Sequence, residues 1–319
     1  MTILRVFANE VDLSIPGAVS TVDPAFFDDS RVTQAFSFID GQTSSVDSEP
    51  AAGADTWYHF RMVHGSTASS WDGITMQIKD PSGNIVALMT VSNGSPNFSA
   101  VGDTTATTLT QVISSNTQYS IDVKVSVTPA NVSMSAYINN NLIGTQTVSN
   151  TSGNRTNPTR VTFANPDNVG PLYISEGIIA DEDTRGFRVR ELRPQSFGVD
   201  QAWAGSANDV VDNDLATGIS TPTTGARTSF GVSNLQNITA GDIVNRVVAQ
   251  TYAQRGATGL TRINHYFRYP DTTRQDGPDI TIDTTGSWYL TEFLNNPSTS
   301  APWDPADLIG IQIGVRAQT

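Results

Sequence analysis

Strict alternation of apolar and polar side chains between residues 119 and 138 constrains the fold of this chain most. Every second residue of Tyr119–Val127 is apolar, and the residues between them are polar. Successive side chains of a strand point to opposite faces, so this pattern predicts a strand with one buried face. The alternation returns in Val132–Ile138, and the asparagines at 139–141 then predict a turn, because asparagine tolerates positive φ. Two consecutive antiparallel hairpins follow.

Sheets that bury one side only are typical of a β-sandwich. No helical periodicity separates the other apolar runs. The one convincing helical turn is Pro302–Leu308, where Asp304 can act as the N-cap and Pro305 fits the first helical position. The sequence therefore predicts an all-β protein. We expect its further strands at residues 31–39, 57–63, 74–78, 85–91, 160–164, 172–180, 187–192, 227–232, 243–254, 260–269, 279–282, 288–294 and 309–315.

The length of the chain predicts two domains, since 319 residues exceed one ordinary sandwich. We place a larger jelly roll at residues 1–194 and a smaller antiparallel β-sandwich at residues 226–319. Residues 195–225 lack sustained periodicity and are interpreted as a connecting segment, possessing at most one or two short strands.

The charge balance bears on the class of partner. Thirty-one acidic and 18 basic side chains give a net charge of −13, so we expect no nucleic-acid partner. The absence of cysteine excludes disulfides and thiolate chemistry. The N-terminus carries Arg5, Glu10 and Asp12 within what would have to be an apolar core, and no apolar run reaches about 20 residues. We therefore expect neither a signal peptide nor membrane insertion.

The order of several landmarks resembles the concanavalin A-like (laminin-G-like) jelly roll, which implies that fold for the first domain. The landmarks are residues 57–62, 71–74, 119–125, 136–141 and 174–176.

A second set of segments, which covers both domains, is similar to structural proteins of tailed bacteriophages. The segments are residues 175–186, 192–194, 202–205 and 303–315. This resemblance implies a virion component and does not give its place on the virion. Our hypothesis is a non-enzymatic structural protein on the virion surface, such as a fibre, spike or capsid decoration subunit. We expect it to contact other virion proteins and copies of itself, as a homo-oligomer, and to contribute to host adsorption.

Catalytic signatures are weak in this sequence. A glycosidase of this fold would need paired carboxylates across a cleft, and the glutamates do not show the Glu-X-Asp-X-(X)-Glu pattern of jelly-roll glycosidases. The histidines, His59, His64 and His265, lack metal-ligand spacing and are interpreted as ordinary strand and turn residues, with His59 on the outward face of its strand. We therefore expect no enzyme, and a polysaccharide-degrading activity is the least favoured alternative.

Calcium is the one cofactor that the sequence leaves open. Asp209, Asp212 and Asp214, or Asp72 with Asn93, could supply the several oxygen ligands that calcium requires. The alternative is that these side chains are solvated turn residues of an acidic protein, and we expect no bound cofactor.

Carbohydrate binding is the main alternative function, as a lectin-like adhesin that recognises a host-surface glycan. Such sites pair an exposed aromatic ring with acidic or amide side chains. Trp71 with Asp72 and Asn93, and Trp203 in its loop, are the candidate residues. Either tryptophan could equally cap a hydrophobic core.

Overall fold

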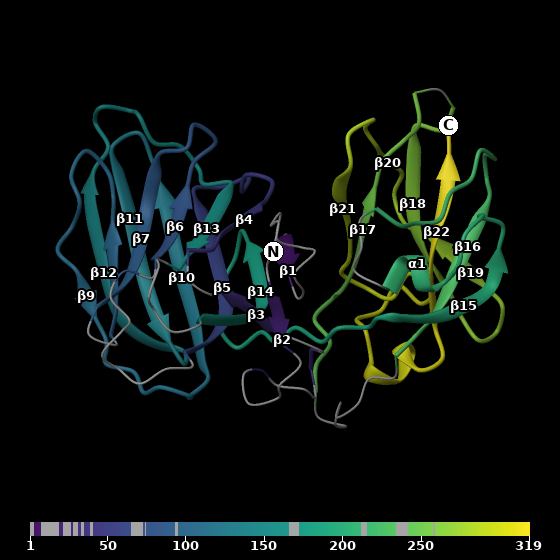
Figure 1. Ribbon diagram of the computed structural model, residues 1–319, viewed down its shortest axis with the longest axis horizontal. Helices are drawn as coiled ribbons and strands as arrows, with labels where there is room; N and C mark the ends of the chain where they lie inside the picture. The colour runs from purple at the N-terminus through teal and green to yellow at the C-terminus, as the bar shows by residue number, and fades with distance from the viewer. Residues whose placement is uncertain are drawn as a thin grey trace. The chain divides into compact units, whose positions relative to one another are not determined.

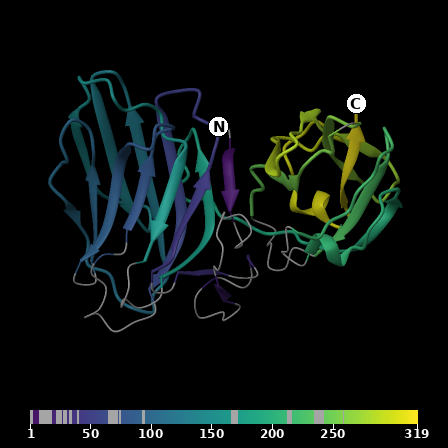
Figure 2. The ribbon, with the colours of Figure 1, turned by 45° about the horizontal axis from the view of Figure 1, so that its top comes forward.

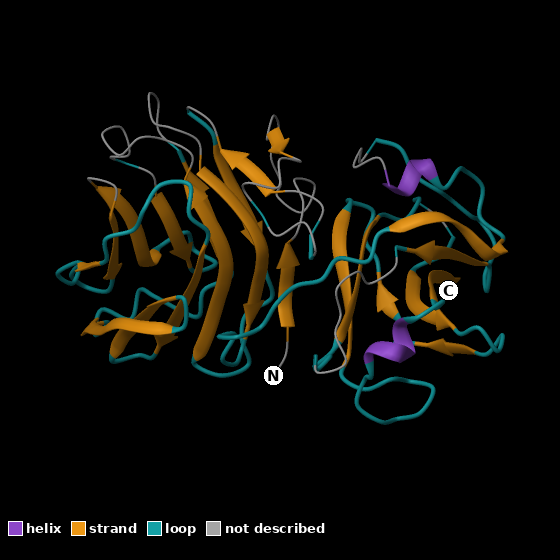
Figure 3. Ribbon diagram, turned by 90° about the horizontal axis from the view of Figure 1, so that it is seen from below, coloured by secondary structure: helices purple, strands orange, loops and turns teal. Residues whose placement is uncertain are grey.

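The protein is built almost wholly from antiparallel strands, which confirms the all-β prediction. A computed structural model describes residues 3–7, 19–21, 27, 31–32, 35–38, 41–64, 73, 75–92, 95–165, 172–211, 216–233, 242–257 and 259–319. Within these ranges the helical segments are two short turns, α1 (Asn208–Val211) and η2 (Pro305–Leu308), drawn in purple in Figure 3. None of the described helices is long and apolar enough to cross a membrane.

The chain divides into two compact units, Met1–Glu191 and Leu192–Thr319. The expected connecting segment 195–225 lies within the second unit, where Pro194–Gln201 forms β15 and pairs with β16 (Arg227–Val232). Two register shifts interrupt this pairing. Irregular pairing on an edge strand removes the two-residue periodicity, which explains why the sequence pattern did not reveal β15.

Unit 1 is a sandwich of two sheets that lie face to face (Figures 1 and 2). The eight-stranded sheet has the order β12-β11-β10-β5-β14-β3-β2, with β1 also paired to β14. Its strands are β1 (Ile3–Phe7), β2 (Val19–Thr21), β3 (Ala35–Phe38), β5 (Asp55–His64), β10 (Tyr119–Val127), β11 (Asn131–Ile138), β12 (Asn141–Ser149) and β14 (Leu172–Ala180). The six-stranded sheet has the order β4-β13-β6-β7-β8-β9. Its strands are β4 (Thr43–Asp47), β6 (Thr75–Lys79), β7 (Ile85–Ser92), β8 (Ser95–Ala100), β9 (Leu109–Thr110) and β13 (Arg160–Ala164).

The apolar positions of β10 point into the space between the sheets, as their alternation predicted. Ile121, Val123 and Val125 are fully buried there, together with Phe60 and Met62 of β5. Burying each such side chain stabilises the fold by roughly 1.5–3 kcal/mol. The odd-numbered face of β10 is thus committed to the core, and its even-numbered face points away from the core.

One polar side chain joins the two sheets near their edge. Gln146 of β12 accepts a hydrogen bond from the backbone N–H of Ala100 at 2.8 Å through its Oε1 atom, and its Nε2 atom donates to the carbonyl of Thr107. Gln146 and Ala100 are both buried, so the bond between them is shielded from water, whereas Thr107 is exposed. This side chain therefore satisfies the backbone N–H of Ala100 in the opposite sheet, which would otherwise be buried without a partner, and it also ties β12 to the segment between β8 and β9.

Unit 2 has a larger sheet with the strand order β15-β16-β22-β18-β19 and a two-stranded sheet, β17-β21. Its remaining strands are β17 (Val247–Ala253), β18 (Arg262–Arg268), β19 (Arg274–Asp276), β20 (Ile280–Thr281, paired with β18), β21 (Ser287–Phe293) and β22 (Gln312–Gln318). Phe267 packs edge-on against Phe293 and Trp303, with ring centroids 4.7 and 5.3 Å away.

The predicted helical turn is present as η2. The side chain of Asp304 accepts from the N–H of Ala306 at 2.8 Å, and the side chain of Asp307 accepts from the N–H of Asp304 at 2.9 Å. These reciprocal bonds form a capping box, with Pro305 at the first helical position.

Candidate functional site

The outer face of the eight-stranded sheet in unit 1 carries the polar side chains that alternate with the core. Strand register places Asp122 of β10 between His59 of β5 and Tyr137 of β11. Lys124, two residues further along β10, lies opposite Trp57 of β5. These five side chains therefore share one face of the sheet.

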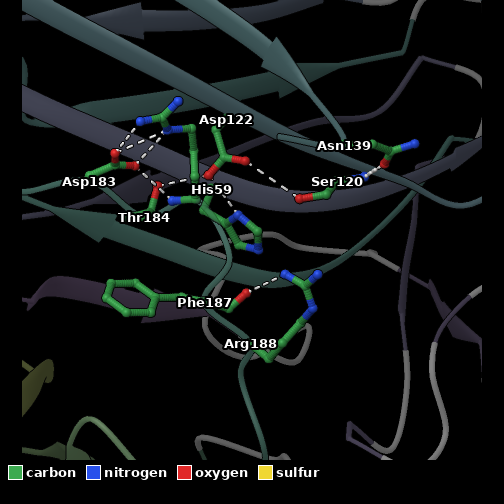
Figure 4. A network of polar contacts seen from close by, with 9 residues as sticks. His59, Ser120, Asp122, Asn139, Asp183, Thr184, Phe187 and Arg188 are labelled. Carbon is green, nitrogen blue, oxygen red and sulfur yellow. Dashed lines mark hydrogen bonds and ion pairs between the residues drawn. The ribbon is translucent and has the colours of Figure 1, made fainter. Parts of the chain in front are cut away.

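A buried hydrogen-bond network occupies one part of this face (Figure 4). Oδ1 of Asp122 lies 2.8 Å from Nδ1 of His59 and accepts a hydrogen bond from Oγ1 of Thr184 at 2.8 Å. Oδ2 of Asp122 accepts a longer hydrogen bond, 3.5 Å, from Ser120. His59, Asp122 and Thr184 are each 0% exposed. A carboxylate oxygen accepts, so the arrangement assigns the proton of this pair to Nδ1 of His59.

The prediction that His59 lies on the outward face of its strand is right for the sheet but wrong for the molecule. Thr184 comes from the segment that follows β14, and its hydrogen bond to Asp122 shows that this segment covers the face above His59 (Figure 4). Strand periodicity reports which side of a sheet a residue occupies and cannot report a loop that covers that side.

Two aromatic rings mark the boundary of the covered area. Trp57 and Tyr137 stack with ring centroids 5.7 Å apart and an interplanar angle of 25°. Trp57 is 6% exposed, whereas Tyr137 is half-buried. The guanidinium of Arg185 lies 4.5 Å from the ring centroid of Tyr137 and 5.6 Å from that of Trp57. We call the pair Trp57 and Tyr137 the aromatic ledge.

Each cation beside the aromatic ledge has an acidic partner. Arg185 donates to Asp183, and these hydrogen bonds hold the pKa of Asp183 below its usual value. Lys124 lies with its Nζ atom 5.9 Å from the Trp57 centroid and 2.7 Å from a carboxylate oxygen of Asp55. The ledge is therefore flanked by two ion pairs that are partly exposed to water.

Beyond the ledge, the same face presents rows of hydroxyl groups on β10, β11 and β12. Oγ of Ser135 and Oγ1 of Thr145 lie 2.8 Å apart, and Oγ of Ser133 and Oγ1 of Thr147 lie 2.9 Å apart. In each pair one hydroxyl donates and the other keeps its proton for a further acceptor. We call these four side chains and Ser126, which donates to Asp55, the hydroxyl floor.

The sequence-predicted sugar site is placed only in part. Trp71, Asp72 and Asn93 lie outside the described residues. Trp203 belongs to unit 2, where its indole Nε1 atom donates to the carbonyl of Ala226 at 3.2 Å. Its ring packs against the cluster that contains Ile263, Ile282 and Val315. Trp203 thus has the core-capping position that the sequence left open as the alternative.

The predicted calcium residues are also divided. Asp212 and Asp214 lie outside the described residues. Asp209 lies in α1, and its carboxylate accepts from the backbone N–H of Ser206 at 2.8 Å and from the Ser206 hydroxyl at 3.2 Å. Within the described ranges, no group of three or more histidine, aspartate or glutamate side chains is placed to hold a metal ion. Calcium binding at Asp209, Asp212 and Asp214 stays a prediction.

Sequence analysis did not identify the aromatic ledge. Tyr137 occupies a polar position of an alternating strand, and Trp57 precedes the apolar run of β5. An aromatic residue on the polar side of a strand is a signal that could have pointed to Tyr137. The contact with Trp57 across β10 depends on strand order and register, which one sequence does not reveal.

The sequence has no match among protein-family models or curated proteins. Among solved structures, it is similar to the receptor-binding domain of botulinum neurotoxin type G, with a TM-score of 0.37 and 11% identity over 82% of this chain and 81% of that chain. It is similar to the CBM2 module of the evolved Dit of Lactobacillus casei BL23 phage J-1, with a TM-score of 0.36 and 12% identity over 56% of this chain and 97% of that chain. A third neighbour is the Caenorhabditis elegans galectin LEC-6, with a TM-score of 0.31 and 10% identity over 45% of this chain and 95% of that chain. These neighbours are sheet-rich domains, and likenesses of this size assign no function.

Proposed function

We propose that unit 1 binds carbohydrate on the outer face of its eight-stranded sheet. The observation that carries the proposal is the stacked pair Trp57 and Tyr137 beside the paired hydroxyls of the hydroxyl floor. A sugar ring has an apolar face that packs on an aromatic ring and hydroxyls that exchange hydrogen bonds with polar side chains. The Tyr137 ring of the ledge, once Arg185 has moved away, and the hydroxyl floor offer both kinds of contact on one surface.

Arg185 regulates access to the Tyr137 ring in this proposal. Its guanidinium covers the ring face on which a sugar would stack. The ion pair with Asp183 joins residues two apart, whose side chains are 37% and 44% exposed, so this pair holds Arg185 with only about 0.2–1 kcal/mol. The contact with the ring adds roughly 0.5–1 kcal/mol. A sugar ring can therefore displace Arg185 and leave it at the edge of the site as a hydrogen-bond donor.

Binding to a glycan array by the purified full chain tests the proposal, with Tyr137→Ala as the decisive variant. We expect the variant to bind the same glycans about 5- to 30-fold more weakly, because the loss of one aromatic contact of this kind is worth roughly 1–2 kcal/mol. Tyr252→Ala is the matched control, since Tyr252 makes an edge-on aromatic contact with Trp288 in unit 2, at 5.6 Å.

Trp71→Ala belongs in the same measurement, because it tests the site that sequence analysis favoured. Binding that is unchanged in Tyr137→Ala, or a wild-type chain that binds no glycan, contradicts the proposed face. Loss of binding in Trp71→Ala alone would move the site to the sequence-predicted residues.

The place of such an adhesin is on the surface of a phage-like virion, where it would assemble with other virion proteins and act in host adsorption. Support for this location comes from the resemblance of its sequence segments to phage structural proteins. Immunogold labelling of particles tests it: label on the particle surface is the expected result, and particles without label refute it. We further propose that the chain has no polysaccharide-degrading activity, and release of reducing ends from host polysaccharide would contradict this.

A further inference from the structure

Five arginines gather on the outer face of the larger sheet of unit 2. The sequence after residue 191 holds eight arginines and no lysine. Strand register places Arg227 of β16 opposite Arg316 of β22, and Arg268 of β18 opposite Arg274 of β19. Arg262 begins β18 and lies on the same face of the sheet as Arg268, because the two are an even number of positions apart on this strand. We call these five residues the arginine face; its strands β16, β18, β19 and β22 are labelled in Figure 1.

Three aspartates lie among these arginines. Asp276 accepts from Nη2 of Arg227 and, at 2.8 Å, from Nη1 of Arg316. Asp200 accepts from Nε and Nη2 of Arg274, at 2.9 and 2.6 Å, and this pairing holds the pKa of Asp200 below its usual value. A third pair, Arg262 with Asp279, is longer at 3.6 Å.

These aspartates do not neutralise the face. Five arginines against three aspartates leave an excess of two positive charges (5 − 3 = 2) in a chain whose net charge is −13. Arg268 makes no hydrogen bond or ion pair with any described residue, and its buried Nε atom has no acceptor. The Nε atoms of Arg227 and Arg316 also lack acceptors in the described structure. Since each guanidinium has five N–H donors, the face has more donors than the protein's own carboxylates satisfy.

The ligand that these donors fit carries carboxylates. The face already binds carboxylates: the fork of Arg274 holds Asp200 with two parallel hydrogen bonds, and one nitrogen from each of Arg227 and Arg316 holds Asp276. The planar guanidinium is suited to pairing with a carboxylate in this way. Arg268 lies opposite Gln312 of β22, four residues from Arg316. At about 3.4 Å per residue the two arginine pairs are thus separated by roughly 14 Å along the strands. Residues 198–200 of β15 lie over Gln312 and Ser229 between the two pairs, so an extended ligand would cross this segment to place recurring carboxylates at both pairs.

An extended acidic chain suits this surface better than a folded protein partner does. Val199 of the edge strand β15 is the one exposed large hydrophobic residue on the described strands of this sheet, and none lies on β16, β18, β19 or β22, whereas the centre of a protein–protein interface is enriched in aromatic and apolar residues. Carboxylates of Asp200 and Asp276 already pair with arginines of this face, which favours a carboxylate ligand over the phosphates of nucleic acid.

We propose that the arginine face is a binding site for acidic polysaccharide in which uronate carboxylates pair with Arg268, Arg274, Arg227 and Arg316. A ligand carboxylate can pair directly with Arg268, because Arg268 makes no hydrogen bond or ion pair in the described structure and its charge acts on Asp200 only through space. This site is in unit 2 and does not depend on the carbohydrate site proposed for unit 1.

Binding of the full chain to polygalacturonate tests the proposal, with fully methyl-esterified polygalacturonate as the ligand that keeps the sugar chain and removes the charge. We expect binding to the acidic polymer alone, weakened as salt rises because ions screen exposed charges. The variant Arg268→Gln is expected to bind at least about tenfold more weakly, since it loses a charge-assisted hydrogen bond to the ligand carboxylate. Arg268 has no partner in the described structure, so its removal leaves the fold intact, which a thermal unfolding scan verifies.

Arg255→Gln is the matched control, because Arg255 follows β17 in the other sheet of unit 2. The proposal is overturned if Arg268→Gln and Arg255→Gln weaken binding of polygalacturonate equally. It is also overturned if the wild type binds the esterified polymer as tightly as the acidic one, or does not bind the acidic polymer at low salt. Duplex DNA that binds as tightly as polygalacturonate, with the same loss in Arg268→Gln, would also overturn it, because the face would then be a general polyanion surface. Tyr137→Ala should leave this binding unchanged, which separates the result from that for unit 1.

Discussion

Removing the carboxylate of Asp122 should destabilise unit 1 selectively. In Asp122→Ala, Nδ1 of His59 and Oγ1 of Thr184 lose the acceptor that lies 2.8 Å from each. Both groups are fully buried, so water cannot replace the carboxylate. An unsatisfied buried donor costs about 1–3 kcal/mol, and two such donors give a loss of about 4 kcal/mol in the free energy of unfolding. With a urea m-value of about 2 kcal/mol/M, the midpoint should fall by about 2 M.

Urea titration followed by tryptophan fluorescence measures this change, and hydrogen-exchange mass spectrometry assigns the transition to peptides of unit 1. Thr184→Val removes one donor and leaves Asp122 with His59, so its midpoint should fall by only about 0.5 M, for a loss of about 1 kcal/mol. Ser133→Ala, on the hydroxyl floor, is the control and should change stability by less than about 0.5 kcal/mol. An Asp122→Ala midpoint equal to that of the wild type would refute the reasoning that this network holds the segment after β14 on the sheet.

Two further predictions concern unit 2. Burial lowers the pKa of His265 from 6.5 to about 4, so the unfolded chain binds a proton more readily than the folded chain at pH values between these two. The stability that the neutral histidine contributes is fully present above pH 6.5 and is lost as pH falls toward 4. Lowering the pH from 7 to 5 should therefore reduce the free energy of unfolding of unit 2 by about 2 kcal/mol, measured by urea titration at both pH values. The variant His265→Gln should show a smaller change of stability with pH. A wild-type urea midpoint that is the same at both pH values would contradict this prediction. Gly314→Ala would place a Cβ atom 2.3 Å from the ring of Tyr266 and 2.6 Å from the carbonyl of Thr228. We therefore expect thermal unfolding to show a loss of roughly 1–3 kcal/mol in the free energy of unfolding. A variant as stable as the wild type would show that the ring moves freely.

Local alternation predicted those parts of the fold in which the two faces of a strand meet different environments. The bounds expected for the strand Tyr119–Val127 agree with β10, because one face meets the core and the other does not. The turn Asn139–Asn141 begins with Asn139 and Asn140 at φ of 50° and 67°, the conformation that asparagine tolerates. The capped turn at Asp304 was readable because all its contacts lie within four residues.

The candidate sites could not be predicted in the same way, because they depend on contacts between distant residues. Asp122 and Thr184 are 62 positions apart, and nothing in either local pattern indicates that they meet. On the arginine face, Arg227 and Arg316 lie opposite each other only because β22 inserts between β16 and β18. Both arrangements depend on which strands are neighbours in the sheet. The alternation of apolar and polar residues within a strand is the same whatever its neighbours are, so it cannot predict these contacts.

The Gln146 bridge fixes how the two sheets of unit 1 are aligned. Apolar layers attract without a preferred direction, so side chains alone would tolerate small slides of one layer over the other. The two amide bonds of Gln146 are directional and would break on such a slide, with the loss of partners for Ala100 and Thr107. Replacing Gln146 by leucine would keep the contact area and remove this lock. Such a protein should remain folded but sample several alignments, visible as broadened methyl resonances.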